Sequence, residues 1–150
     1  MPTFHKNSKG FYQYFFSDPH IQAYTSTCLF NAKFEEEAAG ERQKLLLALN
    51  LESSRLVGAG QTHGNSIQKV NSEDGGKGAL FEKDAFQSTD GFITQTSLVA
   101  LSIKTADCLP LFLVDPFSHA FSVLHAGWRG IRAGIIEKGI EMMKNDFHSN

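Results

Sequence analysis

The chain has 150 residues, with 14 basic and 16 acidic side chains and a formal net charge of −2. Such an even balance excludes the strongly basic surface of a nucleic-acid-binding protein, and two cysteines are too few for a disulfide-dense scaffold. Residues 1–16 carry no signal-peptide pattern, and no apolar run approaches the roughly 20 residues that span a bilayer. We therefore expect one domain over residues 1–150, located in the cytoplasm and without a nucleic-acid or membrane partner.

The apolar pattern predicts the elements in chain order. Strands are expected at residues 11–16, 25–30, 55–60, 66–70, 98–103, 111–114 and 120–124, with a turn and a short strand within 90–94. Helical spacing predicts one helix over 34–49 and another that begins after Gly127 and reaches Met143. The nearly continuous apolar runs 98–103 and 111–114 favour strands buried on both faces. The Asp-Pro turn at 115–118 predicts that 111–114 and 120–124 pair antiparallel.

Three short segments carry the residues best suited to chemistry, and each lies at the end of a predicted strand. They are 61–64 (QTHG), 105–110 (TADCLP) and 125–130 (HAGWRG), which supply His63, Cys108 and His125. Two imidazoles and one thiolate from separate strand ends are typical of a catalytic zinc with an open fourth position, whereas structural zinc usually takes four ligands in close pairs. Bound zinc lowers the pKa of a water molecule to about 7.

These residues also have ordinary structural interpretations, and the residues alone leave both open. A single cysteine in an apolar stretch is most often a small buried side chain, and a single histidine is most often a surface or core residue. We interpret Cys28 as a core residue. The four remaining histidines are interpreted as surface residues: His5, His20, His119 and His148.

Residues 127–130 (GWRG) form a predicted junction between a strand and a helix. The free N–H groups of the first helical turn bind anions, and the Arg129 guanidinium suits a phosphate or a carboxylate. In the alternative interpretation, the two glycines only permit tight packing of the helix on the sheet, and Arg129 is a solvated residue of the first turn.

Taken together, the ordered motifs between residues 41 and 144 resemble one family. The motifs are residues 61–64, 90–94 (DGFIT), 105–110, 115–116 (DP) and 125–130. The family is variously called the laccase-domain, polyphenol oxidase or YfiH-type purine nucleoside phosphorylase family, and also peptidoglycan editing factor. The resemblance implies an α/β fold, a layered sandwich of mixed β-sheets flanked by helices, similar to the deamidase domain of the cytotoxic necrotizing toxins. It also implies that His63, Cys108 and His125 bind a zinc or copper ion.

By the same resemblance, the chain acts on purine nucleosides. The implied reactions are phosphorolysis of adenosine, inosine and methylthioadenosine, and deamination of adenosine. Cys108, Asp107 and Arg129 are then the candidate catalytic residues, with Asp107 as a proton shuttle and Arg129 holding phosphate beside the helix N-terminus. Only two of the six histidines occupy site-like positions, so one mononuclear site is expected rather than a multicopper cluster.

Two alternatives come from other classes of protein. The first is a metal-free cysteine hydrolase or amidase, with Cys108 as nucleophile and His125 as base. The second is a non-catalytic module for peptidoglycan editing or binding that acts through a partner. Because family members continue well beyond the final motif, we expect residues 1–150 to be a domain that is short at its C-terminus. A shortened sheet would leave an exposed edge, which favours a homodimer.

Overall fold

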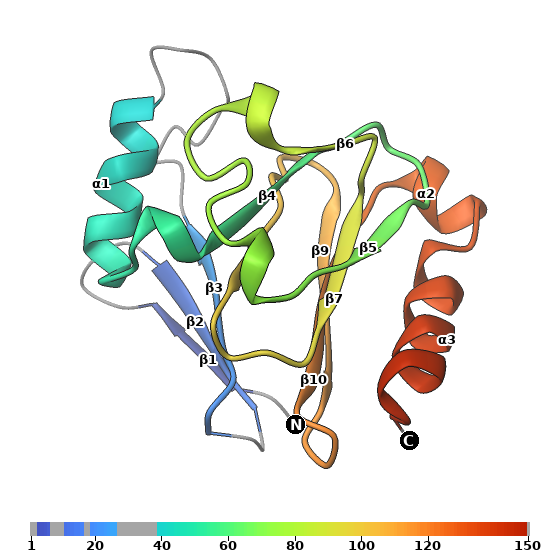
Figure 1. Cartoon of the computed structure of the whole chain (residues 1–150). Helices are drawn as coiled ribbons and strands as arrows, with labels where there is room; N and C mark the ends of the chain where they lie inside the picture. Colours follow the sequence, from blue (N-terminus) through green and yellow to red (C-terminus); the bar gives the residue numbers. More distant parts are fainter. Residues whose placement is uncertain (1–2, 7–10, 17–18, 27–38, 150) are drawn as a thin grey trace.

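The structure is a computed structural model that describes residues 3–6, 11–16, 19–26 and 39–149 (Figure 1). Its strands are β1 Thr3–Lys6, β2 Phe11–Phe15, β3 Gln22–Ser26, β4 Leu56–Gly60, β5 Ile67–Lys69, β6 Phe86–Gln87, β7 Gly91–Thr94, β8 Ala100–Ser102, β9 Leu109–Asp115 and β10 Ala120–Ala126. Its α-helices are α1 Ala39–Leu49, α2 Trp128–Arg132 and α3 Ile135–Phe147, and short 3-10 helices cover Ser53–Arg55, Ser72–Asp74 and Glu82–Asp84.

The described strands form three sheets. A four-stranded sheet has the order β5-β7-β10-β9, in which β5 and β7 are parallel and the other neighbours are antiparallel. A three-stranded sheet has the order β6-β4-β8 and is parallel throughout. The third sheet, β1-β2-β3, is antiparallel, and its Tyr14 ring lies 5.4 Å from the Phe112 ring of β9. Parallel and antiparallel pairs therefore coexist, as a mixed α/β fold requires.

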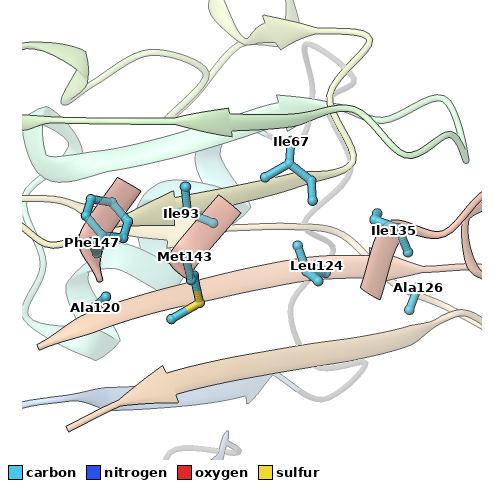
Figure 2. Close-up of a cluster of buried hydrophobic side chains, with 8 residues drawn as sticks. All are labelled: Ile67, Ile93, Ala120, Leu124, Ala126, Ile135, Met143 and Phe147. Carbon is cyan, nitrogen blue, oxygen red and sulfur yellow. The ribbon is translucent and has the colours of Figure 1, made fainter. Parts of the chain in front are cut away.

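Helix α3 covers one face of the four-stranded sheet, and Figure 2 shows the side chains that pack between them. The apolar cluster between them comprises Ile67, Ile93, Ala120, Leu124, Ala126, Ile135, Met143 and Phe147. Side chains alternate between the two faces of a strand, and this alternation turns the fully buried Leu124 of β10 toward the helix. Burial of such a leucine stabilises the fold by roughly 1.5–3 kcal/mol.

The opposite face of the four-stranded sheet packs against the parallel sheet. The cluster between the two sheets comprises Val57, Ala59, Val70, Phe92, Val99 and Val123. His125 follows Val123 by two positions in β10, so it lies on the same face of that strand and is turned toward the parallel sheet. The layering of the fold thus sets the direction of a candidate site residue.

Helix α1 closes the other side of the parallel sheet, where Leu46 packs against Leu56 and Ala79. The layers therefore run from α3 through the two sheets to α1, with the two helices on opposite sides of the molecule (Figure 1). This arrangement confirms the predicted layered sandwich of mixed sheets flanked by helices. Within the described part of the chain, no helix has the length and apolar character needed to cross a membrane.

The predicted helix after Gly127 is wrong in one respect, because the structure breaks it into α2 and α3. Gly134 separates them with φ of +79°, a left-handed conformation that no α-helix continues through. Three apolar residues of the predicted stripe are also exposed: Trp128 at 68%, Ile131 at 46% and Ile140 at 42%.

Several predicted strands differ in extent or burial from those observed. Residues 100–102 and 111–114 are only half-buried, so the prediction of burial on both faces is wrong there, and β9 lies at an edge of its sheet among the described strands. Strand β3 begins at Gln22, before the predicted 25–30, and residues 27–30 lie outside the described part. The same holds for residues 34–38 of the first predicted helix and for Cys28. The antiparallel pairing of 111–114 with 120–124 is confirmed.

Candidate metal centre

The structure brings His63, Cys108 and His125 together, and their ligand atoms all lie within 4.8 Å of one another. The β9–β10 hairpin explains why Cys108 and His125 lie close together. Leu109 pairs with Ala126 and Pro110 with His125, so Cys108, which immediately precedes β9, comes next to the end of β10. His63 reaches the same point from the turn after β4, and its ring lies 4.7 Å from the His125 ring in an edge-on orientation.

The three side chains differ in their exposure to solvent. His125 is buried at 3% exposure, Cys108 is half-buried and His63 is exposed. A metal ion held here would be enclosed on the His125 side and open to solvent on the His63 side. Two nitrogen ligands and one sulfur ligand with an open side match the donor set of a catalytic zinc site.

Gly127 leaves room for this cluster. An ideal Cβ built on Gly127 would stand 2.9 Å from the Sγ of Cys108 and 3.4 Å from the Cδ2 of His63. Any larger residue would therefore fill the space between the two ligands. The donor set and this space both fit a small ion such as Zn²⁺, whose protein ligands lie about 2.0–2.3 Å away.

Asp90, which immediately precedes β7, is the polar centre of the site and is fully buried. Its Oδ1 lies 2.9 Å from the Nδ1 of His125 and accepts a hydrogen bond from the His63 N–H at 2.8 Å. Its Oδ2 accepts from the Gly64 N–H at 2.8 Å and from the N–H and hydroxyl of Thr62 at 3.3 and 3.2 Å. One carboxylate thus contacts both histidines of the site.

The pKa of Asp90 reflects two opposing effects. Burial would raise it, because a charged group loses its hydration, but the hydrogen bonds from His125 and from the backbone N–H groups of residues 62–64 outweigh burial. The net pKa lies below the ordinary aspartate value, so Asp90 is a carboxylate at neutral pH. As a carboxylate it only accepts hydrogen bonds.

The backbone of His63 adopts a left-handed conformation with φ of +62°. This conformation costs a residue with a side chain roughly 1–2 kcal/mol. The hydrogen bond from the His63 N–H to Asp90 offsets part of that cost. Strain of this kind concentrates at functional sites.

Gln61 connects two of the three segments that supply the ligands. Its Nε2 donates to the Lys104 carbonyl at 2.8 Å, and its Oε1 accepts from the Lys104 N–H at 2.7 Å. The turn that carries His63 is therefore fastened to the segment that leads into Cys108. Neither Gln61 nor Asp90 was predicted as a site residue. One sequence signal could have identified Asp90. It is an ionisable residue immediately before an apolar strand, and a charged side chain that is buried there needs hydrogen-bond partners.

The other predicted site residues lie at the surface. Asp107 is exposed beside Cys108. Arg129 is exposed on α2, with its guanidinium 5.2 Å from the centre of the Trp128 ring. The four histidines interpreted as surface residues are all exposed: His5, His20, His119 and His148. Because α2 has only five residues, its dipole adds less to anion binding than the long helix predicted from sequence would.

Comparison with known proteins identifies the family. Residues 26–150 match the family model described as multi-copper polyphenol oxidoreductase laccase, and the chain belongs to this family. It is 37% identical over 110 residues to a Bacillus subtilis protein named purine nucleoside phosphorylase YlmD, covering 73% of this chain and 38% of the relative. It is 36% identical over 99 residues to the Geobacillus stearothermophilus protein of the same name, covering 66% and 36%. The chain thus spans about two fifths of the length of these relatives.

Solved structures show the same fold. The Bacillus licheniformis hypothetical protein YfiH superposes with a TM-score of 0.86 at 25% identity, covering 98% of this chain and 60% of that one. YlmD from Geobacillus stearothermophilus superposes with a TM-score of 0.73 at 32% identity, covering 76% and 43%. These likenesses confirm both the predicted fold class and the family that the sequence motifs indicated.

Proposed function

We propose that this chain holds one zinc ion through His63, Cys108 and His125 and acts on purine nucleosides. The observation that carries the proposal is the convergence of the three ligand side chains within 4.8 Å, from three separate segments. Support for the substrate class comes from the relatives, which are named purine nucleoside phosphorylases. The same donor set also accepts copper, which is the alternative metal.

When bound, zinc supplies Lewis acidity, which makes a water molecule acidic enough to yield hydroxide near neutral pH. In adenosine deamination, water adds at C6 of the purine and ammonia leaves, and Asp107 moves the proton. In phosphorolysis, a phosphate oxygen forms a bond to C1′ of the ribose while the bond to the purine nitrogen breaks, and the base leaves after taking up a proton. Arg129 holds the phosphate for this attack.

The first test follows the reaction and the metal in one sample. Purified protein is incubated with adenosine, with and without phosphate, while inosine and adenine are separated by chromatography and zinc is measured. We expect about one zinc per chain, inosine in both reactions and adenine only with phosphate. Cys108→Ala should lose the zinc and both products. Zinc-free protein, or bound zinc with no turnover, contradicts the proposal, and the latter result favours the non-catalytic module.

The role of Arg129 has a matched control on the same helix. Arg129→Ala should raise the KM for phosphate at least about tenfold and leave deamination unchanged, because a charge-assisted phosphate contact is lost. Arg132 is also exposed on α2, and Arg132→Ala should leave the KM for phosphate unchanged. Equal phosphate dependence in the two variants would remove Arg129 from the mechanism. For Asp107, Asp107→Asn should slow deamination more than phosphorolysis.

One specific observation favours a second candidate function. In space, His125 lies between Asp90 and Cys108, so that an acid, a base and a nucleophile follow one another across the site. This is the arrangement of a metal-free cysteine hydrolase or amidase. Protein that contains no zinc, and in which iodoacetamide alkylates Cys108 rapidly only while His125 is intact, would favour this function over the first.

A further inference from the structure

The described part of the chain contains two buried aspartates, and they bind different partners. Asp115, 5% exposed, caps the turn between β9 and β10 by accepting hydrogen bonds from the Phe117 N–H at 2.9 Å and the Ser118 hydroxyl at 2.7 Å. Asp90, 0% exposed, instead contacts the two histidines of the candidate metal centre. Burying a carboxylate is costly unless its oxygens are fully hydrogen-bonded, so each site is built around its aspartate.

Asp90 determines which nitrogen of His125 is available to a metal. The Asp90 carboxylate only accepts, so the Nδ1 of His125, 2.9 Å away, carries the hydrogen. A neutral imidazole that carries its hydrogen on Nδ1 has a bare Nε2, which is the form that a metal ion requires. His125 is buried and its partner is fixed, so this tautomer is set before any ion arrives.

Asp90 also fixes the turn that presents His63. The carboxylate accepts from three consecutive backbone N–H groups, those of Thr62, His63 and Gly64. Three such bonds hold the left-handed backbone of His63, which would otherwise relax toward a more favourable φ. The direction of the exposed His63 imidazole therefore depends on a buried carboxylate in another segment, just before β7.

We propose that Asp90 is a positioning residue that orients both imidazoles of the metal centre in the metal-free protein, and so raises its affinity for zinc. The proposal rests on the zinc site of the proposed function. Hydrogen-bonded partners of ligand histidines typically change metal affinity 10–100-fold when removed. Asp90 differs from a simple partner of this kind, because its Oδ1 serves both the side chain of His125 and the backbone N–H of His63, while its Oδ2 holds the residues on either side of His63.

The Asp90→Asn variant tests whether the two carboxylate oxygens orient the imidazoles, because it keeps a polar side chain of the same shape buried at this position. An asparagine of the same shape offers one acceptor oxygen and one NH₂ group. If the NH₂ replaces Oδ1, it opposes the N–H of His63 and forces His125 to accept, which moves the hydrogen to Nε2. If the NH₂ replaces Oδ2, it opposes the N–H groups of Thr62 and Gly64 and releases the turn. Either orientation disturbs at least one imidazole.

The experiment compares wild type, Asp90→Asn and the matched control Asp115→Asn. Zinc affinity is measured by competition with a chromophoric chelator, and folding by circular dichroism and urea unfolding. The tautomer of His125 is read from the ¹⁵N chemical shifts of its ring in the metal-free protein. We expect Asp90→Asn to weaken zinc binding about 10–100-fold and to convert His125, wholly or in part, from the Nδ1–H to the Nε2–H form. Asp115→Asn should lower stability and change neither zinc affinity nor tautomer.

Two results overturn the proposal. One is a folded Asp90→Asn variant with wild-type zinc affinity. The other is a wild-type, metal-free protein in which His125 is the Nε2–H tautomer, and this result needs no variant, so it decides the matter even if Asp90→Asn does not fold. A wild-type protein that binds no zinc overturns the proposed metal function instead, while the ring shifts of His125 still report whether Asp90 orients it.

Discussion

Gly127 stands so close to Cys108 that an ideal Cβ on the glycine would lie 2.9 Å from the thiol sulfur. The backbone of Gly127 has φ of −72° and ψ of 161°, which any residue adopts, so the position needs a glycine for space and not for conformation. Gly127→Ala should therefore displace the thiol. We expect zinc affinity to fall at least about tenfold, equivalent to about 1.4 kcal/mol, measured by chelator competition.

The matched control makes the same change where there is room. Gly40 is exposed in α1, and no described atom lies within 4 Å of an added Cβ. Gly40→Ala should leave zinc affinity unchanged. Wild-type zinc affinity in a folded Gly127→Ala protein would show that the ligand cluster tolerates a methyl group, which would argue against the proposed position of the ion.

Gln61 offers a second test of how the segments are held together. Gln61→Ala removes both hydrogen bonds to the Lys104 backbone, each worth about 0.5–1.5 kcal/mol. The segment before Cys108 should then move more freely relative to the His63 turn. We expect faster alkylation of Cys108 by iodoacetamide in the metal-free protein, measured by mass spectrometry of its peptide, and weaker zinc binding.

Gln95 provides the control, because it also fastens a strand end to the backbone of a turn. Its Nε2 donates to the Ser118 carbonyl, beside the turn between β9 and β10 and at the opposite end of the hairpin from Cys108. Gln95→Ala should reduce stability without changing the alkylation rate. If both variants react at the same rate as wild type, the Gln61 connection does not control the position of Cys108.

Local sequence signals were enough to predict most of the strands and one pairing, although β1 and β6 were not predicted. The apolar run 111–114, the Asp-Pro turn and the run 120–124 specify a hairpin, and residues adjacent in sequence form it. The pairing of β4 with β6 and β8 was not predictable, because it joins residues separated by 27 and 44 positions through backbone hydrogen bonds that any residue can make. The edge position of β9 among the described strands of the four-stranded sheet likewise depends on which strands pair, and not on the apolar content of β9.

The candidate ligands were predictable for a different reason, since only a few side chains bind soft metals. His63, Cys108 and His125 lie at strand ends, and strand ends meet at sheet edges. Asp90 was missed, because its importance lies in burial and in partners from two distant segments. From the sequence alone, Asp90 is interpreted as a turn residue. Only the fold shows that its side chain is fully buried.

Asp74 gives a prediction about pH. Burial raises its pKa, but the hydrogen bond from Lys77 at 2.6 Å and that from the Asn71 N–H at 2.9 Å outweigh burial, so the pKa lies below the ordinary value. A depressed pKa contributes stability above the unfolded pKa of about 3.9, and that stability is lost as the pH falls further. Asp74→Asn should cost up to about 1 kcal/mol at pH 7, as for a partly exposed ion pair, and this cost should be smaller at about pH 3, below the unfolded pKa.

The measurement is urea unfolding of both proteins at the two pH values. Asp84→Asn serves as control, because Asp84 lies in a 3-10 helix whose N-cap residue, Phe81, makes no side-chain hydrogen bond. The Asp84→Asn variant removes the same charge from an exposed position, so its free energy of unfolding should differ little from that of wild type at either pH. A cost of Asp74→Asn that stays constant between pH 7 and pH 3 would contradict a role for its ionised form.

The break between α2 and α3 can be tested through the sign of a glycine substitution. Gly134 has φ of +79°, and an added Cβ would meet only Glu137 Oε2 at an ordinary 3.7 Å, so Gly134→Ala carries a conformational cost without a clash. We expect a loss of about 1–2 kcal/mol. Gly40→Ala, in helix α1, should instead gain up to about 1 kcal/mol. Urea unfolding midpoints measure both. If Gly134→Ala raised the midpoint as Gly40→Ala does, residues 128–147 would form the continuous helix that their apolar spacing predicts.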